Sequence, residues 1–425
     1  MRDCMRIVVA TVALALALAV PAQAQFTQYF APGSLGETED PLRRQIEQAM
    51  ERARWRLGPI RLEPWVGIRN IGYIDNVYGT ATNQTSDFTV SAGAGLRAYL
   101  PVGSKTVLFA RALPEYSWWK DLDNRRGWTG RYTAGAYVFF NRLTLEGYAN
   151  RTEQQSYINA ELETPITNRL DTALVSMELR LLRRLSIVAS GSRSEFRIDT
   201  GALEAGLARW YEALERDEDV LRVGLRYAFS ERLAITVGGQ RSEAEFTQPI
   251  FDRSNVGDGL YSTISFTGQR ISLSVNGTRY TVEPKRGSQF TTFESTAGQA
   301  SLGYRLTERI GWQVFAGRSL VYSITGVAGY YTDTRVGTGV SLTLGRRLST
   351  RVHYEEGTFE YPGGELSSFD RDYRGWGASL STRVFRTASL GVSWTRSEYT
   401  RSSGTTRVDR VQTTVSFAGG GLGWW

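Results

Sequence analysis

The spacing of apolar residues along the chain changes near residue 59. Between residues 40 and 57 apolar side chains recur every three or four positions, and from Pro59 onward they recur at every second position. The first spacing puts them on one stripe of a helix, and the second puts them on one face of a strand. The chain is therefore predicted to form a short helix followed by a long series of strands, with clear alternation at 143–148, 233–238, 271–276, 348–355 and 390–394.

The second face of these strands is rich in Gly, Ser, Thr and Asn, and the strands are about twelve to fifteen residues long. Strands of soluble proteins usually have five or six residues. A soluble propeller would also show a blade-length repeat, and the sequence has none. An apolar face toward lipid and a polar face toward the interior is the dyad pattern of a membrane barrel. The predicted fold class is all-β, a transmembrane antiparallel up-and-down barrel over residues 58–425.

Short polar connections alternate along the chain with mostly longer ones. Asn141-Arg142 and Arg183-Arg184 are examples of the short kind, and 75–86 and 199–216 are examples of the long kind. In outer-membrane barrels the short turns are periplasmic and the longer loops are extracellular. Eight turns and nine loops join eighteen strands, and this even number suits a chain whose two ends are both periplasmic.

The N-terminal 24 residues have the features of a secretory signal peptide. Two arginines precede an apolar stretch at 7–20, and a small-residue cleavage site ends at Ala24. This apolar stretch is too short to cross a bilayer as a helix, which takes about 20 residues. Residues 25–57 then form a periplasmic segment, in which Asp40 and Pro41 begin an amphipathic helix. The helix could plug the pore, sit on the periplasmic rim or dock a partner; the alternative is a linker that is helical part of the time.

Composition narrows the range of functions. The one cysteine, Cys4, lies in the signal peptide, the one histidine is His353, and neither a metal cluster nor a phosphate-binding loop is present. No cofactor is expected. The formal net charge is +7, but 50 basic and 43 acidic residues are interspersed. A concentrated basic tract is missing, so nucleic acid is not an expected partner.

Charged residues on the polar face are expected to point into the barrel, because a charge on the lipid face near the midplane costs about 2–4 kcal/mol. An eighteen-stranded barrel is too wide for its side chains to fill. These residues are thus candidates to line a pore and select solutes by sign, or to form ion pairs that brace the wall. They are Arg97, Arg111, Glu115, Glu146, Glu178, Arg180, Arg222, Arg226, Arg351, His353, Glu355, Arg383 and Arg410.

Catalysis has little support in the sequence. A catalytic site of the Ser/His or Asp/His kind needs an imidazole, and His353 is the sole candidate, with Glu355 on the same face to orient it. A single histidine on a barrel wall is more simply a solvated wall residue. The chain is therefore expected not to be an enzyme.

Two groups of aromatic residues are candidates for binding. The predicted loop helix at 202–214 carries Trp210 and Tyr211, which would narrow the pore or cap its outer mouth. Tyr116, Trp118 and Trp119 lie near the outer end of a strand and fit the interfacial aromatic girdle better than a sugar-stacking platform. The last strand alternates up to Phe417 and the chain ends in two tryptophans, which resembles the signal read by the barrel-assembly machinery.

Asp75-Asn-Val-Tyr78, followed by Ser86-Asp87-Phe88, resembles the first hairpin of the β-barrel porin type 2 family. The resemblance covers about 40 residues. Several members of that family occur with exopolysaccharide secretion systems, so the resemblance implies a channel that exports a polysaccharide and meets a periplasmic export protein. Two alternatives remain: a general or anion-preferring diffusion porin, usually trimeric, and a structural or adhesin-like barrel whose pore is plugged. In each case the expected location is the outer membrane, in contact with its lipid.

Overall fold

The computed structural model describes residues 46–418, except 48, 52, 54, 81–82, 157, 159–160, 162–164, 202–204, 249–251, 286–287, 289–291, 325–328, 346, 363–369, 386–387 and 402–403. The predicted signal peptide, the start of the predicted N-terminal helix and the two C-terminal tryptophans lie outside this range. The signal peptide and the C-terminal assembly signal stay predictions.

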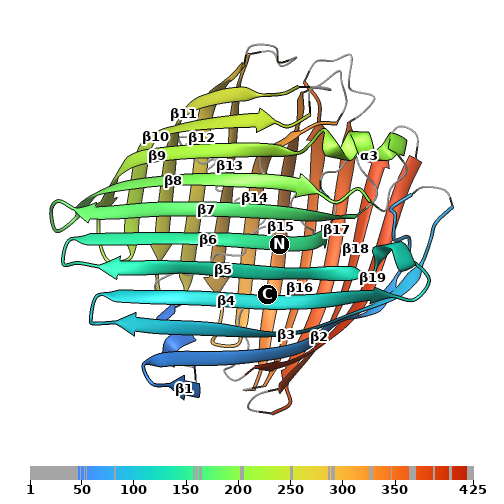
Figure 1. The fold of residues 1–425 in the computed structure, drawn as a ribbon, viewed down its shortest axis with the longest axis horizontal. Helices are drawn as coiled ribbons and strands as arrows, with labels where there is room; N and C mark the ends of the chain where they lie inside the picture. The colour runs from blue at the N-terminus through green and yellow to red at the C-terminus, as the bar shows by residue number, and fades with distance from the viewer. Residues whose placement is uncertain are drawn as a thin grey trace.

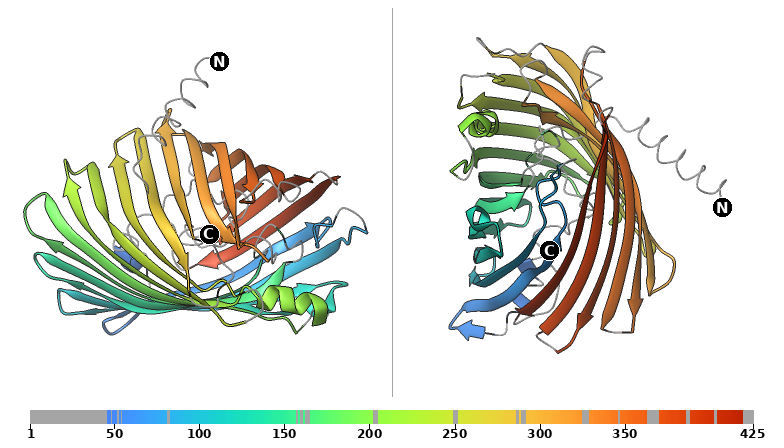
Figure 2. Two further views of the ribbon diagram at one scale, coloured as in Figure 1. Left: turned by 90° about the horizontal axis from the view of Figure 1, so that it is seen from above. Right: turned by 90° about the vertical axis from the view of Figure 1, so that its right-hand side faces the viewer.

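Strands β2 to β19 form one closed antiparallel barrel (Figure 1 and Figure 2). Each strand pairs with the next in the chain, and β19 pairs with β2 to close the ring. β1 (Trp55–Leu57) adds a short edge to β2, so the ring itself has eighteen strands, as predicted. The ring strands are β2 (Ile60–Ile74), β3 (Asp87–Val102), β4 (Thr106–Trp119), β5 (Gly127–Phe139), β6 (Leu143–Ser156), β7 (Ile166–Arg180), β8 (Leu185–Ile198), β9 (Arg216–Ala228), β10 (Leu233–Phe246), β11 (Asn255–Thr267), β12 (Ile271–Pro284), β13 (Phe293–Arg305), β14 (Ile310–Tyr322), β15 (Tyr330–Leu344), β16 (Leu348–Glu360), β17 (Arg371–Arg383), β18 (Ala388–Arg401) and β19 (Gly404–Ala418).

Short turns and longer loops alternate around the barrel as the sequence predicted. The turn between β3 and β4 spans residues 103–105, whereas the loop between β8 and β9 spans residues 199–215 and contains α3 (Ala205–Glu212). A one-turn helix, η1 (Asp123–Arg125), lies in the loop between β4 and β5. Among the described residues no helix is long and apolar enough to cross a membrane.

The outer face of the barrel is apolar in its periplasmic half. On β9 the side chains of Leu221, Val223 and Leu225 are exposed by 50–57%. Arg222 and Arg226, at the alternate positions of the same strand, lie on the inner face. A strand whose alternate residues differ in this way has one face toward lipid and one toward the interior.

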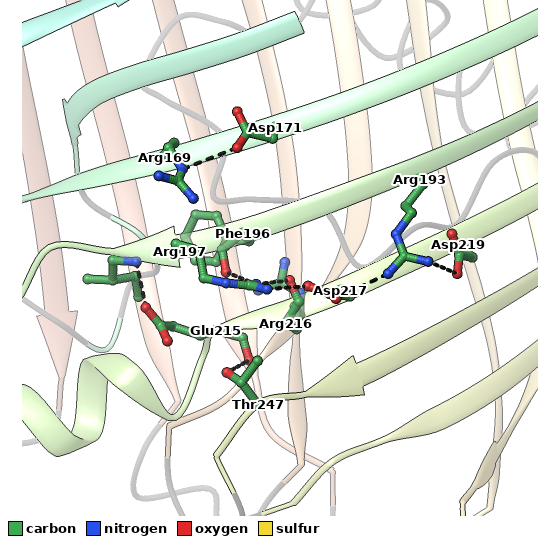
Figure 3. Close-up of polar contacts among 11 residues, drawn as sticks. Arg169, Asp171, Arg193, Phe196, Arg197, Glu215, Arg216, Asp217, Asp219 and Thr247 are labelled. Atoms are coloured by element: carbon green, nitrogen blue, oxygen red, sulfur yellow. Dashed lines mark hydrogen bonds and ion pairs between the residues drawn. The ribbon is translucent and has the colours of Figure 1, made fainter. Parts of the chain in front are cut away.

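In the extracellular half of β7, β8 and β9 the outer face becomes charged (Figure 3). Arg193 contacts Asp217 at 3.4 Å and Asp219 at 3.6 Å, on the same face as Leu221. On β7 the guanidinium of Arg169 lies 3.2 Å from Asp171. The apolar outer surface of these strands therefore ends near mid-strand.

Inside the extracellular end, apolar side chains form packed clusters. The largest joins Phe196 of β8, Tyr280 of β12 and Leu320 and Tyr322 of β14 to residues of the connecting loops. Leu320 is fully buried, and the side chains on both faces of this end of β14 are covered. A substantial part of the extracellular end is thus filled by protein.

Candidate functional site: the inner face of the barrel

All thirteen residues predicted for the interior lie on the inner face of the wall. Strand register shows this, because paired residues share a face: Arg222 pairs with Gln240, and Glu355 pairs with Gly337. The exposed apolar residues of the same strands, such as Leu221 and Val352, alternate with them. Placement on the inner face meets the first requirement for lining a pore. Their contribution to solute selection stays a prediction.

Several of these charges form ion pairs with residues of an adjacent strand or of the strand beyond it. Arg226 donates to Glu178 at 3.0 Å, and Arg97 donates to Glu63 at 3.2 Å. Glu115 accepts two hydrogen bonds from Arg69, one of them at 3.1 Å. The side chains of Arg226 and Glu178 keep 42% and 36% of their surface exposed, whereas Glu63 keeps 4%. Exposed pairs such as Arg226 and Glu178 therefore fit a role in solute selection, and buried residues such as Glu63 fit a role in bracing the wall.

A fully buried ion cluster lies on β15, β16 and β17. Arg335 binds Asp333 through two hydrogen bonds of 2.8 Å, and its Nη1 lies 3.9 Å from the carboxylate of Glu355. Tyr373 donates to Glu355, and the Arg335 guanidinium lies 4.5 Å from the Tyr373 ring centroid. The side chains of Arg335, Asp333 and Glu355 have no exposed surface. This cluster braces the wall and presents no charge to a solute.

The remaining predicted residues make neutral contacts or lie near the rim. Arg222 donates to Gln240 at 2.8 Å, Arg111 donates to Thr133 at 2.9 Å, and Glu146 accepts from Ser176 at 3.4 Å. Arg351 reaches Gln313 at 3.4 Å. Arg180 and Arg383 are exposed near the periplasmic ends of β7 and β17, and Arg410 sits on β19 next to β2.

Sequence reasoning did not find four charged residues that complete these pairs: Glu63, Arg69, Asp333 and Arg335. Asp333 and Arg335 follow the alternation of β15 and could have been found from it. Arg69 lies beside a β-bulge in β2, where Asn70 has a φ of 54° and the register shifts between Arg69 and Gly72. A bulge reverses the alternation of a strand, so counting residues through it misplaces one side.

His353 lies on the inner face of β16 with its ring against Gly377 of β17. A Cβ on Gly377 would come within 2.1 Å of the His353 ring, so the glycine makes room for the imidazole. Glu355, which the sequence offered as an orienting carboxylate, binds Tyr373 and Arg335 instead. The described residues also contain no group of His, Cys, Asp and Glu suited to a metal ion. Among the described residues, the carboxylate that the sequence offered to orient His353 is therefore bound to other groups.

The loop between β6 and β7 reaches across the extracellular end of the barrel. Its Glu161 accepts hydrogen bonds from the hydroxyls of Ser323 and Tyr361 at 2.5 and 2.6 Å, and from the backbone N–H of Ile324 at 2.6 Å. Ser323 and Ile324 follow β14, and Tyr361 follows β16, whereas six strands separate β7 from β14 around the wall. We refer to these bonds as the Glu161 contact. It ties one side of the mouth to the other.

Burial strengthens the Glu161 contact. Burial and the Glu161 carboxylate both raise the pKa of the Tyr361 phenol, so that it stays a proton donor to Glu161 at neutral pH. Arg253, in the loop between β10 and β11, is 2% exposed and donates to the carbonyl of Ala213. Burial lowers the pKa of Arg253 to about 10, and the Glu161 carboxylate acts in the opposite direction. The contact thus joins the part-buried Glu161 carboxylate to the buried side chains of Ser323 and Tyr361.

α3 lies at the extracellular rim beside β8 and β9 (Figure 1). Tyr211 is 1% exposed and packs with Phe196 and Leu214 in the largest apolar cluster, while Trp210 keeps 40% of its surface exposed. Tyr211 therefore anchors the helix to the wall. A constriction role for these two residues stays a prediction.

The described end of the N-terminal segment lies against the inner face of β3, β4 and β5. Ile46 is 6% exposed and packs with Tyr99 and Tyr137, and Met50 lies at the edge of the same cluster. Arg61 donates to the carbonyl of Met50 at 3.0 Å. Residues 46, 47 and 49–51 are helical. Of the three placements that the sequence left open, these contacts favour one inside the periplasmic part of the barrel.

No protein-family model and no curated protein matches this sequence. Among solved structures the chain is similar to OpdO, OccK2 (OpdF) and OpdQ of Pseudomonas aeruginosa. OpdO gives a TM-score of 0.51 at 12% identity, over 86% of this chain and 98% of OpdO. OccK2 gives 0.50 at 12% over 84% and 97%, and OpdQ gives 0.50 at 12% over 86% and 99%.

Identities this low show a shared fold, which here extends over almost the full length of each solved chain. Together with the apolar outer face, the fold makes this protein a β-barrel of the outer membrane. The resemblance of the first hairpin to the porin type 2 family stays a prediction.

Proposed function

We propose that this protein is a constricted diffusion channel for small hydrophilic solutes, with a preference for anions. The observation that carries the proposal is the Glu161 contact within a closed barrel of eighteen strands. A barrel of this size has room for water inside unless segments fold inward. One loop tied across the mouth narrows such an interior without requiring it to close.

The expected sign preference follows from the inner-face charges that remain exposed. Arg180 and Arg383 are exposed on this face, and among the described residues no acidic group is hydrogen-bonded to either. Glu178, a part-exposed acid on the inner face, is paired with Arg226. Guanidinium groups in a narrow aqueous space raise the local concentration of anions. A modest preference for anions over cations follows.

Export of a polysaccharide is the alternative that the first hairpin implied. A polymer needs a continuous wide path, and the Glu161 contact and the N-terminal residues beside Tyr99 both occupy the interior. Export would thus require both to move, for which a periplasmic export protein docked on the N-terminal segment is the expected trigger. An adhesin-like barrel with a permanently filled interior is the third possibility.

Single-channel conductance in planar bilayers separates these functions. The mature chain, a chain lacking residues 25–53 that keeps β1, and Glu161→Ala would be compared in salt gradients. We expect steady conductance and a reversal potential on the anion side for the mature chain, and a larger conductance for Glu161→Ala. A mature barrel that conducts only after removal of 25–53 would replace the proposal with a plugged, partner-gated channel. A barrel silent in all three forms would support the adhesin-like alternative.

A further inference from the structure

The outer faces of β2, β3, β4 and β5 carry no charged residue at any of their outward positions, all of which lie in the described part of the chain. On β3 every outward residue from Phe88 to Val102 is apolar, and Leu96 and Val102 are exposed by 41% and 49%. Aromatic residues take the extracellular end, where Tyr116 and Trp128 stack edge to face at 5.4 Å. We call this surface the β2–β5 panel.

Elsewhere on the barrel the same part of the outer face is charged. On β6 and β7, Arg151 binds Asp171 with hydrogen bonds of 2.6 and 3.0 Å. On β8 and β9, Arg197 binds Asp217 at 2.6 Å (Figure 3), and on β12 Arg279 binds Glu294 of β13 at 3.0 Å. These strands are as long as those of the panel. The contrast therefore reflects side-chain type and not strand length.

At β3 the panel, with the aromatic residue at its extracellular end included, is taller than the lipid layer that would cover it. With a rise of about 3.3 Å per residue and a tilt of about 40°, the outward side chains from Phe88 to Val102 span about 35 Å of height. The apolar band of such barrels is about 25 Å tall. On β8 the outward apolar residues, Leu185 to Gly191, span about 15 Å by the same arithmetic. A tilt of the barrel would change which residues contact the lipid, but it would not make the lipid layer thicker.

The chemistry of the panel suits another flat apolar sheet. Its centre consists of small side chains, which let two backbones approach closely and pack by van der Waals contact inside a membrane. They are Ala92, Ala94, Ala98, Ala110, Ala112, Ala134 and Ala136. Charged partners find no counter-charge on it. At β3 lipid alone would leave Phe88 and Val90 above the apolar band, at the level of the headgroups.

We propose that the β2–β5 panel is the contact surface between copies of this chain in the outer membrane. The outward residues of these four strands span about 33 to 46 Å along each strand, and with strands about 4.8 Å apart they give an area of roughly 800 Å². A standard interface buries about 800 Å² on each partner. The panels of two copies are alike, flat and uncharged. Each panel can therefore cover the apolar side chains that extend above the lipid on the other.

Bulky substitutions on the panel and away from it test this contact. Ala94→Trp, at the centre of the panel, would hold two sheets apart yet remain compatible with lipid. Ala189→Trp, on the outer face of β8, is the matched control. Light scattering in mild detergent should give an oligomer for the unmodified protein and for Ala189→Trp, and a monomer for Ala94→Trp. Heat-dependent migration in gels would verify that each barrel has folded.

Cysteine crosslinking in intact outer membranes covers the case in which detergent separates the copies. Because Cys4 falls in the predicted signal peptide, Ala94→Cys and Ala189→Cys each introduce one thiol. A short bifunctional crosslinker should join copies of Ala94→Cys at least tenfold more than copies of Ala189→Cys. Equal crosslinking, or an oligomer that survives Ala94→Trp, would overturn the proposal.

Discussion

Two ion pairs on the inner wall use the same residue types in different surroundings. The cluster of Arg335, Asp333 and Glu355 has no exposed surface, whereas Arg226 and Glu178 keep about two fifths of theirs. In the first case the charges have lost all contact with water and depend on one another. In the second, water solvates both partners. The comparison shows that an inward charge acts on solutes only where the surrounding side chains leave it in contact with the interior solution.

Removing the cation should therefore destabilise the buried cluster far more than the exposed pair. Arg335→Met leaves Asp333 and Glu355 buried without a counter-charge, and breaking a buried pair this way costs about 3–5 kcal/mol. Arg226→Met is the matched control on the exposed pair, with an expected cost of about 0–1 kcal/mol. Urea unfolding followed by tryptophan fluorescence measures both. Similar losses for the two variants would mean that burial does not distinguish these sites.

The Glu161 contact should fall between these two sites. Tyr361→Phe removes one phenol donor to the part-buried Glu161 carboxylate, and a hydrogen bond to a charged group contributes about 1.5–3 kcal/mol. We expect an intermediate loss in the same urea experiment, together with a noisier channel current as the β6–β7 loop moves. Tyr354→Phe removes an exposed phenol that donates to Glu356 at 2.8 Å and serves as control. A quiet current in Tyr361→Phe would show that the phenol does not hold the loop.

The exposed pair should affect ion selectivity more than stability. Arg226→Gln leaves Glu178 unneutralised and should shift the reversal potential toward cations. Glu178→Gln frees Arg226 and should shift it toward anions by a similar amount. Arg335→Gln, in barrels that still fold, should leave the reversal potential unchanged because that cluster has no exposed surface. Shifts of the same sign in Arg226→Gln and Glu178→Gln would remove the exposed pair from the list of selectivity residues.

Alternation along the strands was sufficient to place charges on the correct face. Arg97, Arg222 and Glu355 each follow a regular strand, and each points inward as predicted. Counting residues through Asn70 would assign the wrong face, because a bulge inserts one residue there and reverses the pattern. The sequence also did not predict which of the inward charges are exposed to water. Glu178 and Glu355 look alike along the chain, yet one is exposed and the other buried.

By itself the sequence determined the all-β barrel, the eighteen strands of its ring, the rhythm of turns and loops, and the face that each regular strand residue takes. These properties follow from local alternation, which a period of two encodes in neighbouring residues. Tertiary structure alone decided which charges pair, which of them keep contact with water, and that Glu161 meets Tyr361 across the mouth. Those partners lie 200 residues apart in the chain, and only closure of the ring and inward folding of the loops bring them together.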